Sequence, residues 1–247
     1  MHRTNRATLL CTMILAAATQ PLGAQTPAQL LARYSKLTDP TGALTRVEGM
    51  RTQMTMEIAA AGIKASISMA QRNPDQMVMT VDIPSVGVMR TGYDGSTAWS
   101  ADPMQGPRIL TGNEAAAISD VASLRALLRT PDQFTSIESA SDVTVDGDAA
   151  KCVTLTWKSS RVTTECFSIA TGLMTEARQK QQSQMGEIEA VTRYADYRMV
   201  GGIMIPHRMT QSAMGMQQVM AIVSVEIGAQ DAKLFDVPAE IAALKRK

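Results

Sequence analysis

Apolar and polar side chains alternate along most of the chain after residue 46. The stretches IKASISMA (63–70) and MVMTVDI (77–83) both place apolar side chains at odd positions. A period of two is typical of antiparallel strands with one buried and one solvated face. The same pattern predicts further strands at about 142–147, 150–158, 161–169, 172–183, 186–198, 203–213 and 216–227. The chain is therefore expected to be mainly β, with about eleven strands.

Two windows follow a helical period instead. PAQLLARYSKLT (27–38) starts directly after a potential cap at Thr26 and predicts one helix. The window from residue 112 to 130 ends before Pro131 and places four apolar residues on one stripe, which predicts an amphipathic helix. The residues of this stripe are Ile118, Val121, Leu124 and Leu128.

A sheet of about eleven strands is too wide to stay flat, so we expect it to curl into an open half-barrel. Its concave apolar face needs a cover, and the helix with the apolar stripe is the expected helical lid. The sequence leaves open whether this face lines a cavity or packs directly on the lid. The residues assigned to it by parity are Met54, Met56, Ile58, Ile67, Met69, Met77, Met79, Val81, Val223 and Val225.

Methionine is unusually abundant, with 18 residues against only three phenylalanines and two tryptophans. Unbranched, polarizable side chains adapt to apolar ligands of varied shape, although methionine also serves as ordinary core filler. Trp99 follows the Asp94-Gly95 pair, a strong hairpin signal, on the returning strand. We expect Trp99 at the cavity wall, with a plain core position as the alternative.

The N-terminus predicts the compartment. Arg3 and Arg6 precede the apolar run ATLLCTMILAAA, and a small residue follows at Ala24. This is a secretory signal peptide pattern, so we expect a signal peptide at 1–24 and one domain at 25–247 in the periplasm. The formal net charge of the chain is +1, which argues against nucleic acid as a partner.

Catalytic chemistry is not indicated. His207 is the one histidine outside the signal peptide, and its parity places it on an apolar face. The paired carboxylates, such as Asp94 with Asp102 and Asp146 with Asp148, lie in glycine-containing turns where aspartate is favoured for backbone reasons. We therefore predict no catalytic residue, no metal site and no cofactor.

Two cysteines remain after the predicted cleavage. A hairpin centred on Ser159 places Cys152 directly opposite Cys166, on a face that also carries Thr154 and Thr164. An exported compartment permits this pair to form a disulfide, provided that the register is right. We predict a Cys152–Cys166 disulfide on the polar, convex side of the sheet.

Four segments, in this order, resemble the LolA family of periplasmic lipoprotein carriers and the broader LolA/LolB-like group. They are QRNPDQMVMTV (71–81), YDGSTAWSADP (93–103), YADYRMVGGIMIPHRM (194–209) and VEIGAQDAKLFDVP (225–238). The resemblance covers nearly all of the chain after residue 24.

The resemblance implies an eleven-stranded half-barrel that takes the acyl chains of a lipoprotein or lipid beneath its lid. The expected function is non-enzymatic transport through the periplasm to the outer membrane, by a monomer that exchanges cargo with inner- and outer-membrane transfer proteins. The alternative is an envelope sensor or scaffold that uses the same fold to bind a protein partner. The resemblance also implies that Arg72 latches the lid, although Asn73 separates it from Pro74 where the family has arginine directly before proline.

Overall fold

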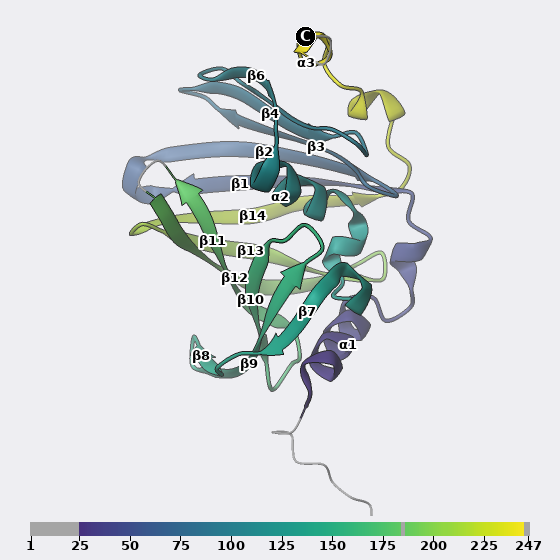
Figure 1. Cartoon of the computed structure of the whole chain (residues 1–247), viewed down its shortest axis with the longest axis vertical. Helices are drawn as coiled ribbons and strands as arrows, with labels where there is room; N and C mark the ends of the chain where they lie inside the picture. The colour runs from purple at the N-terminus through teal and green to yellow at the C-terminus, as the bar shows by residue number, and fades with distance from the viewer. Residues whose placement is uncertain (1–24, 184–185, 245–247) are drawn as a thin grey trace, which may run out of the picture.

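A computed structural model describes residues 25–183 and 186–244 (Figure 1). The signal peptide predicted at 1–24 lies outside these residues. The first half of the described chain contains helix α1 (Pro27–Thr38), strands β1 (Gly49–Ile58), β2 (Ile63–Arg72), β3 (Gln76–Ile83), β4 (Gly87–Tyr93), β5 (Ala98–Asp102) and β6 (Gly106–Ile109), and helix α2 (Gly112–Ala122).

The second half is again mostly strand. It contains β7 (Phe134–Ser139), β8 (Val143–Val145), β9 (Asp148–Trp157), β10 (Val162–Ser168), β11 (Met174–Ser183), β12 (Gly186–Val200), β13 (Ile203–Ala213), β14 (Met216–Ile227) and helix α3 (Ala239–Leu244). Short 3-10 helices lie at Ala43–Thr45, Ala59–Ala61, Leu124–Leu127, Pro131–Gln133 and Ala232–Phe235.

All the strands belong to one antiparallel sheet of 14 strands, so the expectation of a mainly β chain is confirmed. The strand order is β6-β5-β4-β3-β2-β1-β14-β13-β12-β11-β10-β9-β7, and β8 pairs with β9 beside this path. The sheet thus consists of two meanders, one of strands β1–β6 and one of strands β7–β14. They join where β1 pairs with β14. Their outer strands β6 and β7 end the path, which leaves the sheet open. The sequence pattern predicted no strand at β6 or β7 and thus underestimated the number of strands.

Helix α1 begins and ends where the sequence predicts it. The Thr26 hydroxyl accepts a hydrogen bond from the Gln29 backbone N–H, and the Gln29 side chain accepts one from the Thr26 N–H. This capping box satisfies two backbone donors at the start of the helix. The apolar side of α1, with Leu31 and Tyr34, packs against Phe167 and Leu155 of the sheet.

Two further clusters cover the other end of the sheet, one on each face. Leu124, just after α2, packs with Met50, Ile203 and Ile205. On the opposite face, Phe235 and other residues of the C-terminal segment pack over β2, β3, β5 and β6. In Figure 1 α2 lies between β2–β4 and β10–β11, on the same side of the sheet as α1. We call the face that carries α1, α2 and Leu124 the inner face, and the other the outer face.

Candidate functional site

The inner face of β1–β3 is a continuous apolar surface. Strand register places Met54 opposite Ile67, which in turn lies opposite Val81. The structure brings eight of the residues assigned to a lid-facing surface onto this face, where some are buried and the rest are half-buried. Met54, Ile67 and Met77 are buried, and Met56, Ile58, Met69, Met79 and Val81 are half-buried.

The last two assigned residues, Val223 and Val225 of β14, lie in different environments. Val225 lies opposite Thr52 and packs in the inner-face cluster around Leu124. A bulge in the β1–β14 pairing then skips Val223, whose side chain is 68% exposed, and Ile222 lies opposite Met54 instead. The inner-face position expected of Val223 is therefore wrong, because an extra residue in one strand reverses the alternation beyond it.

Trp99 lies on the outer face rather than at the cavity wall, in the plain core position that the sequence left as the alternative. It is directly opposite Gly92, which is opposite Val78 on a face that the C-terminal segment covers. Trp99 packs there with Phe235 and Ile241. A Cβ atom on Gly92 would collide with the indole ring, so glycine is required for this close packing.

Helix α2 covers the inner face but buries little of itself. Ala122 is the one buried residue of its eleven, and Ile118 is half-buried. The helix ends at Ser123, which has extended backbone angles, before the 3-10 helix Leu124–Leu127. This break changes the helical phase, so Leu124 is buried and Leu128 packs beside it, whereas Val121 of the predicted stripe is exposed.

Polar bonds rather than apolar packing hold α2 in place. The Gln71 side-chain amide donates to the carbonyl oxygens of Val121 at 2.8 Å and Ala122 at 3.5 Å. The Arg108 guanidinium of β6 forms a bidentate pair with Glu114 near the helix start, at 2.8 and 3.0 Å.

Asp120 ties the other side of α2 to the β9–β10 turn. Its carboxylate accepts from the Ser159 hydroxyl at 2.7 Å and from Arg161 Nε at 2.8 Å. The helix therefore bridges the two parts of the sheet through hydrogen bonds at three places.

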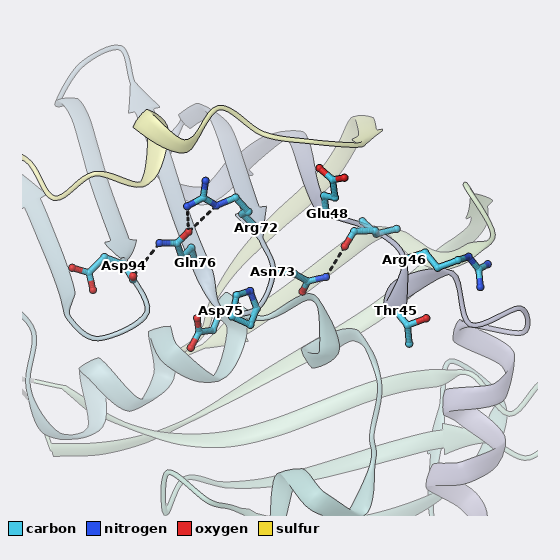
Figure 2. A pocket seen from close by; sticks show the side chains of 10 residues that line it. Thr45, Arg46, Glu48, Arg72, Asn73, Asp75, Gln76 and Asp94 are labelled. Carbon is cyan, nitrogen blue, oxygen red and sulfur yellow. Dashed lines mark hydrogen bonds between the residues drawn. The ribbon is translucent and has the colours of Figure 1, made fainter.

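Arg72 makes different contacts from the latch that the resemblance implies. Its guanidinium donates to the Gln76 side-chain oxygen (Figure 2). The same guanidinium lies over the Phe235 ring, 5.1 Å from its centroid. The physical reason is the period of two: Gln71 faces inward, so its neighbour Arg72 faces outward. Sequence parity would have selected Gln71, which lies at an odd position like the apolar residues of the same strand.

The turn that follows Arg72 borders an open pocket of about 590 Å³ (Figure 2). Gln76 donates to the Asp94 backbone oxygen at 3.1 Å, and Asn73 donates to the Val47 oxygen at 2.6 Å. These bonds hold the β2–β3 turn to the Asp94-Gly95 turn and to residue 47. The polar lining of this pocket makes it a poor candidate for an apolar ligand.

A second cleft, of about 550 Å³, lies beside α2. Ala116 and Ala117 of α2 form one side, and side chains of β10, β11 and β12 such as Val162 form the other. Its size falls within the roughly 300–1,000 Å³ typical of small-molecule sites.

A buried ion pair fixes the segment that follows α2. Arg129 Nε donates to the Glu165 carboxylate at 2.6 Å, and both side chains are largely buried. Burial alone would lower the pKa of Arg129, but the Glu165 carboxylate raises it above its ordinary value, so the cation persists. Burial raises the pKa of neighbouring Tyr194 to about 12. Arg129 and Arg161 both lie over the Trp157 ring, at 5.2 and 4.4 Å.

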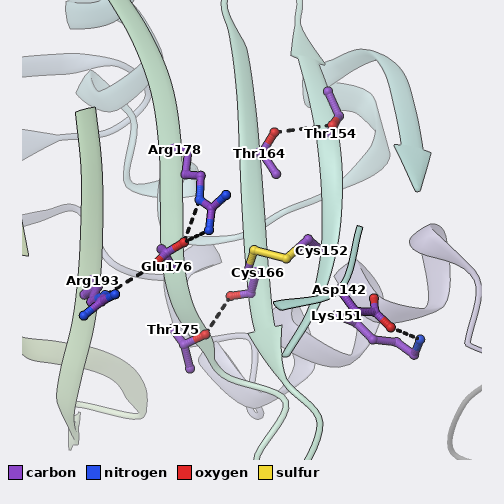
Figure 3. Close-up of a disulfide and its surroundings, with 10 residues drawn as sticks. All are labelled: Asp142, Lys151, Cys152, Thr154, Thr164, Cys166, Thr175, Glu176, Arg178 and Arg193. Atoms are coloured by element: carbon purple, nitrogen blue, oxygen red, sulfur yellow. Dashed lines mark hydrogen bonds and ion pairs between the residues drawn. A yellow bond between two sulfur atoms is a disulfide. The ribbon is translucent and has the colours of Figure 1, made fainter. Parts of the chain in front are cut away.

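The predicted disulfide is present. Cys152 and Cys166 are directly opposite in the β9–β10 register and are joined by an S–S bond (Figure 3). The bridge lies on the outer face, as expected, next to the Glu176 carboxylate and its arginine partners. Both sulfur-bearing side chains are buried in a small cluster with Val145 of the β8 hairpin.

The remaining candidate chemistry is sparse. His207 is buried on the inner face, and its Nδ1 lies 2.9 Å from the Ile205 oxygen. In the part of the chain that the structure describes, no three His, Cys, Asp or Glu side chains gather in a way that could hold a metal ion. Among the helices described, none combines the length and apolar character needed to cross a membrane.

No protein-family model and no curated protein sequence matches this chain. A LolA superfamily protein from Nitrosomonas europaea superposes with a TM-score of 0.57 and 13% identity, covering 87% of this chain and 99% of the other. A DUF1329 family protein from Desulfovibrio piger gives 0.56 and 13%, covering 84% and 95%.

A domain described as belonging to outer membrane lipoprotein-sorting proteins, from Vibrio parahaemolyticus, gives a TM-score of 0.53 and 10% identity. The match covers 83% of this chain and 94% of that one. At such identities the likeness is one of fold, and it extends over nearly the whole of each neighbour. The resemblance to the LolA group that the four sequence segments suggested is confirmed as a likeness of fold to these structures, although the sheet has 14 strands rather than eleven.

Proposed function

We propose that this protein is an exported, non-enzymatic carrier that binds an acyl chain of a lipoprotein or lipid against the inner face. In this proposal the open sheet acts as a half-barrel and α2 acts as its lid. The carrying observation is the combination of half-buried apolar side chains, such as Met56, Met79 and Val81, with a covering helix that buries only Ala122. Such a surface can gain contacts when an acyl chain enters, at about 0.8 kcal/mol per buried methylene.

The polar fastening of α2 supports a movable lid. Gln71, Arg108 and Arg161 hold the helix by hydrogen bonds to their partners, which can be exchanged for water when the helix moves away. The following segment is held by buried Leu124 and by the Arg129–Glu165 pair. Ser123, with its extended backbone between them, is the position at which α2 would turn.

The proposed compartment is the periplasm. A signal peptide pattern precedes the domain, and the disulfide suits an oxidising compartment outside the cytoplasm. The Vibrio parahaemolyticus fold neighbour, which is described as a lipoprotein-sorting domain, supports a lipoprotein-related cargo. In this proposal the cargo is delivered to the outer membrane through membrane transfer proteins.

The test is to purify the protein from the periplasm and to identify bound lipid by native mass spectrometry and extraction. Met79→Asp places a charge on the inner face and should weaken binding of an acylated fluorescent probe at least about tenfold, because a carboxylate is costly to bury. Thr80→Asp on the adjacent outward position is the matched control and should bind as the parent does. A protein that copurifies with no lipid and binds no acylated probe would rule out the carrier. Capture of a protein partner instead would favour a sensor or scaffold.

A further inference from the structure

Four turns at one end of the sheet are apolar and uncharged, although the β9–β10 turn at the same end carries Lys158 and Arg161. The β1–β2, β3–β4 and β5–β6 turns lie at the same end because alternate turns of a meander share an end. The β13–β14 turn joins them, since β14 begins beside the end of β1, where Val219 lies opposite Glu57. In Figure 1 these turns project together on the left side. Their sequences AAAG (59–62), PSVG (84–87), PMQG (103–106) and AMGM (213–216) contain no charged residue.

Large apolar side chains on these turns face water. Met104 is 82% exposed, and Met214 and Met216 are 50% and 54% exposed. Val86 and Val88 of the neighbouring β3–β4 hairpin are exposed as well. We call these five residues the apolar rim. Turn tips in water normally favour polar residues, so a group of exposed methionine and valine side chains on adjacent turns needs an explanation.

The opposite end of the same sheet has the usual chemistry. Its β2–β3 turn contains Asn73 and Asp75, and its β4–β5 turn contains Asp94 and Ser96. Asp94 accepts from the backbone N–H groups of Ser96 and Thr97, as aspartate commonly does in turns. Five exposed large apolar side chains therefore lie at the rim end, whereas Met199 beside the β12–β13 turn is exposed at the opposite end.

The arrangement of the rim fits a lipid bilayer. Successive hairpin turns stand two strands apart, about 10 Å, so each tip can enter the interface separately, whereas a protein partner needs a continuous packed surface. The uncharged Gln105 and Gln217 beside the methionines suit the headgroup region. The half-buried inner-face residues Ile58 and Met56 continue directly from this end.

We propose that the apolar rim is a membrane-contacting surface that inserts Met104, Met214 and Met216 into the interface of a bilayer. The inserted side chains lose water-exposed apolar area, while the Asp102 carboxylate, which accepts from the Met104 and Gln105 backbone N–H groups, stays at the base of the β5–β6 turn in the headgroup region. The bilayer would then lie against the end of the sheet where the inner apolar face begins. This inference rests on the exposed turns and does not require the proposed cargo.

The test measures sedimentation of delipidated protein with vesicles of phosphatidylethanolamine and a minor fraction of phosphatidylglycerol, and with phosphatidylcholine vesicles. The parent protein should bind both, with little effect of salt. The combined variant Met104→Gln, Met214→Gln and Met216→Gln should partition at least about tenfold less. Met199→Gln, at the far end of β12 and 49% exposed, is the matched control and should bind as the parent does.

A second measurement locates the contact. An environment-sensitive dye on Met104→Cys should shift to the blue when vesicles are added, and the same dye on Met199→Cys should not. The proposal fails if the parent protein ignores vesicles, if the triple variant binds undiminished, or if Met199→Gln loses as much binding. A rim that serves a protein partner would leave the dye spectrum unchanged by vesicles. A parent protein that binds vesicles but binds no acylated probe would overturn the proposed carrier function and leave the membrane-contacting surface standing.

Discussion

Gln71 of β2 donates its side-chain amide to the Val121 carbonyl oxygen of α2 at 2.8 Å, which joins the sheet to the end of the covering helix. Gln71 is buried although it is polar, and both acceptors lie in the last turn of α2, where carbonyl groups lack partners within the helix. The same bond therefore satisfies the helix end and holds the helix against the inner face.

Replacing this side chain should loosen α2. Gln71→Leu keeps the size of the residue but removes the donor, which costs about 1 kcal/mol and should speed local opening about fivefold. The measurement is hydrogen exchange of the α2 backbone amides. Gln53→Leu removes a similar amide, which bonds to Ser68 on the outer face, and should leave α2 exchange unchanged. Equal acceleration in both variants would contradict the role of the Gln71 bond in holding α2.

The buried pair Arg129–Glu165 should be important for stability. Glu165→Gln leaves the Arg129 cation buried without its anion, and we expect a loss of about 3–5 kcal/mol in the free energy of unfolding by urea. Asp132→Asn breaks the exposed pair with Arg125 in the same segment and should cost less than about 1 kcal/mol. Comparable losses of unfolding free energy in the two variants would show that burial of Glu165 adds nothing to the stabilisation by its ion pair.

Removing the disulfide should destabilise the β9–β10 hairpin. The bridge spans a sequence separation of 14 residues, and a closed loop of this size restricts the unfolded chain by about 3 kcal/mol. The double variant Cys152→Ser, Cys166→Ser should unfold at lower urea concentration than the oxidised parent. Adding a reductant should shift the parent to the same midpoint and leave the double variant unaffected. A parent whose midpoint ignores complete reduction would contradict this expectation.

The tyrosine side chains should lose their protons at a higher pH in the folded protein than in the unfolded chain. Burial raises the pKa of Tyr34, Tyr93, Tyr194 and Tyr197, for Tyr194 to about 12. The folded state therefore keeps protons that the unfolded chain releases near pH 10, so this contribution to stability is complete below that pH and is lost as pH rises toward the folded values. Absorbance of the phenolate at 295 nm should show no step from Tyr34, Tyr194 or Tyr197 at the ordinary pKa before unfolding. A reversible step of these three tyrosines near pH 10 in the folded protein would contradict this.

Local patterns predicted the parts of the fold that depend on neighbouring residues. The cap at Thr26 and Pro27 predicts α1 correctly, and a hairpin centred on Ser159 is sufficient to place Cys152 opposite Cys166. The period of two also predicts the inner face of β1–β3 correctly, because alternation holds wherever a strand is regular.

The errors arise where one residue changes the phase. The bulge at Val223 reverses the alternation of β14, and Ser123 interrupts the helical period before Leu124. The sequence could not decide between the cavity wall and the core for Trp99, because the length of the turn after Tyr93 decides which face the returning strand presents and because Phe235 and Ile241 cover the outer face from far along the chain. Long-range cover of this kind leaves no periodic signal in the strand that it buries.

The pairing of β1 with β14 has a consequence for how the molecule assembles. These strands form the seam between the two meanders, and they lie more than 150 residues apart at the positions of Met50 and Ile227. Each meander can form from contacts between adjacent strands, but the seam must wait until the final strand has left the ribosome, and contacts of this separation form slowly. The seam therefore stays open until β14 has been made, a delay that would suit the proposed passage across a membrane in the unfolded state.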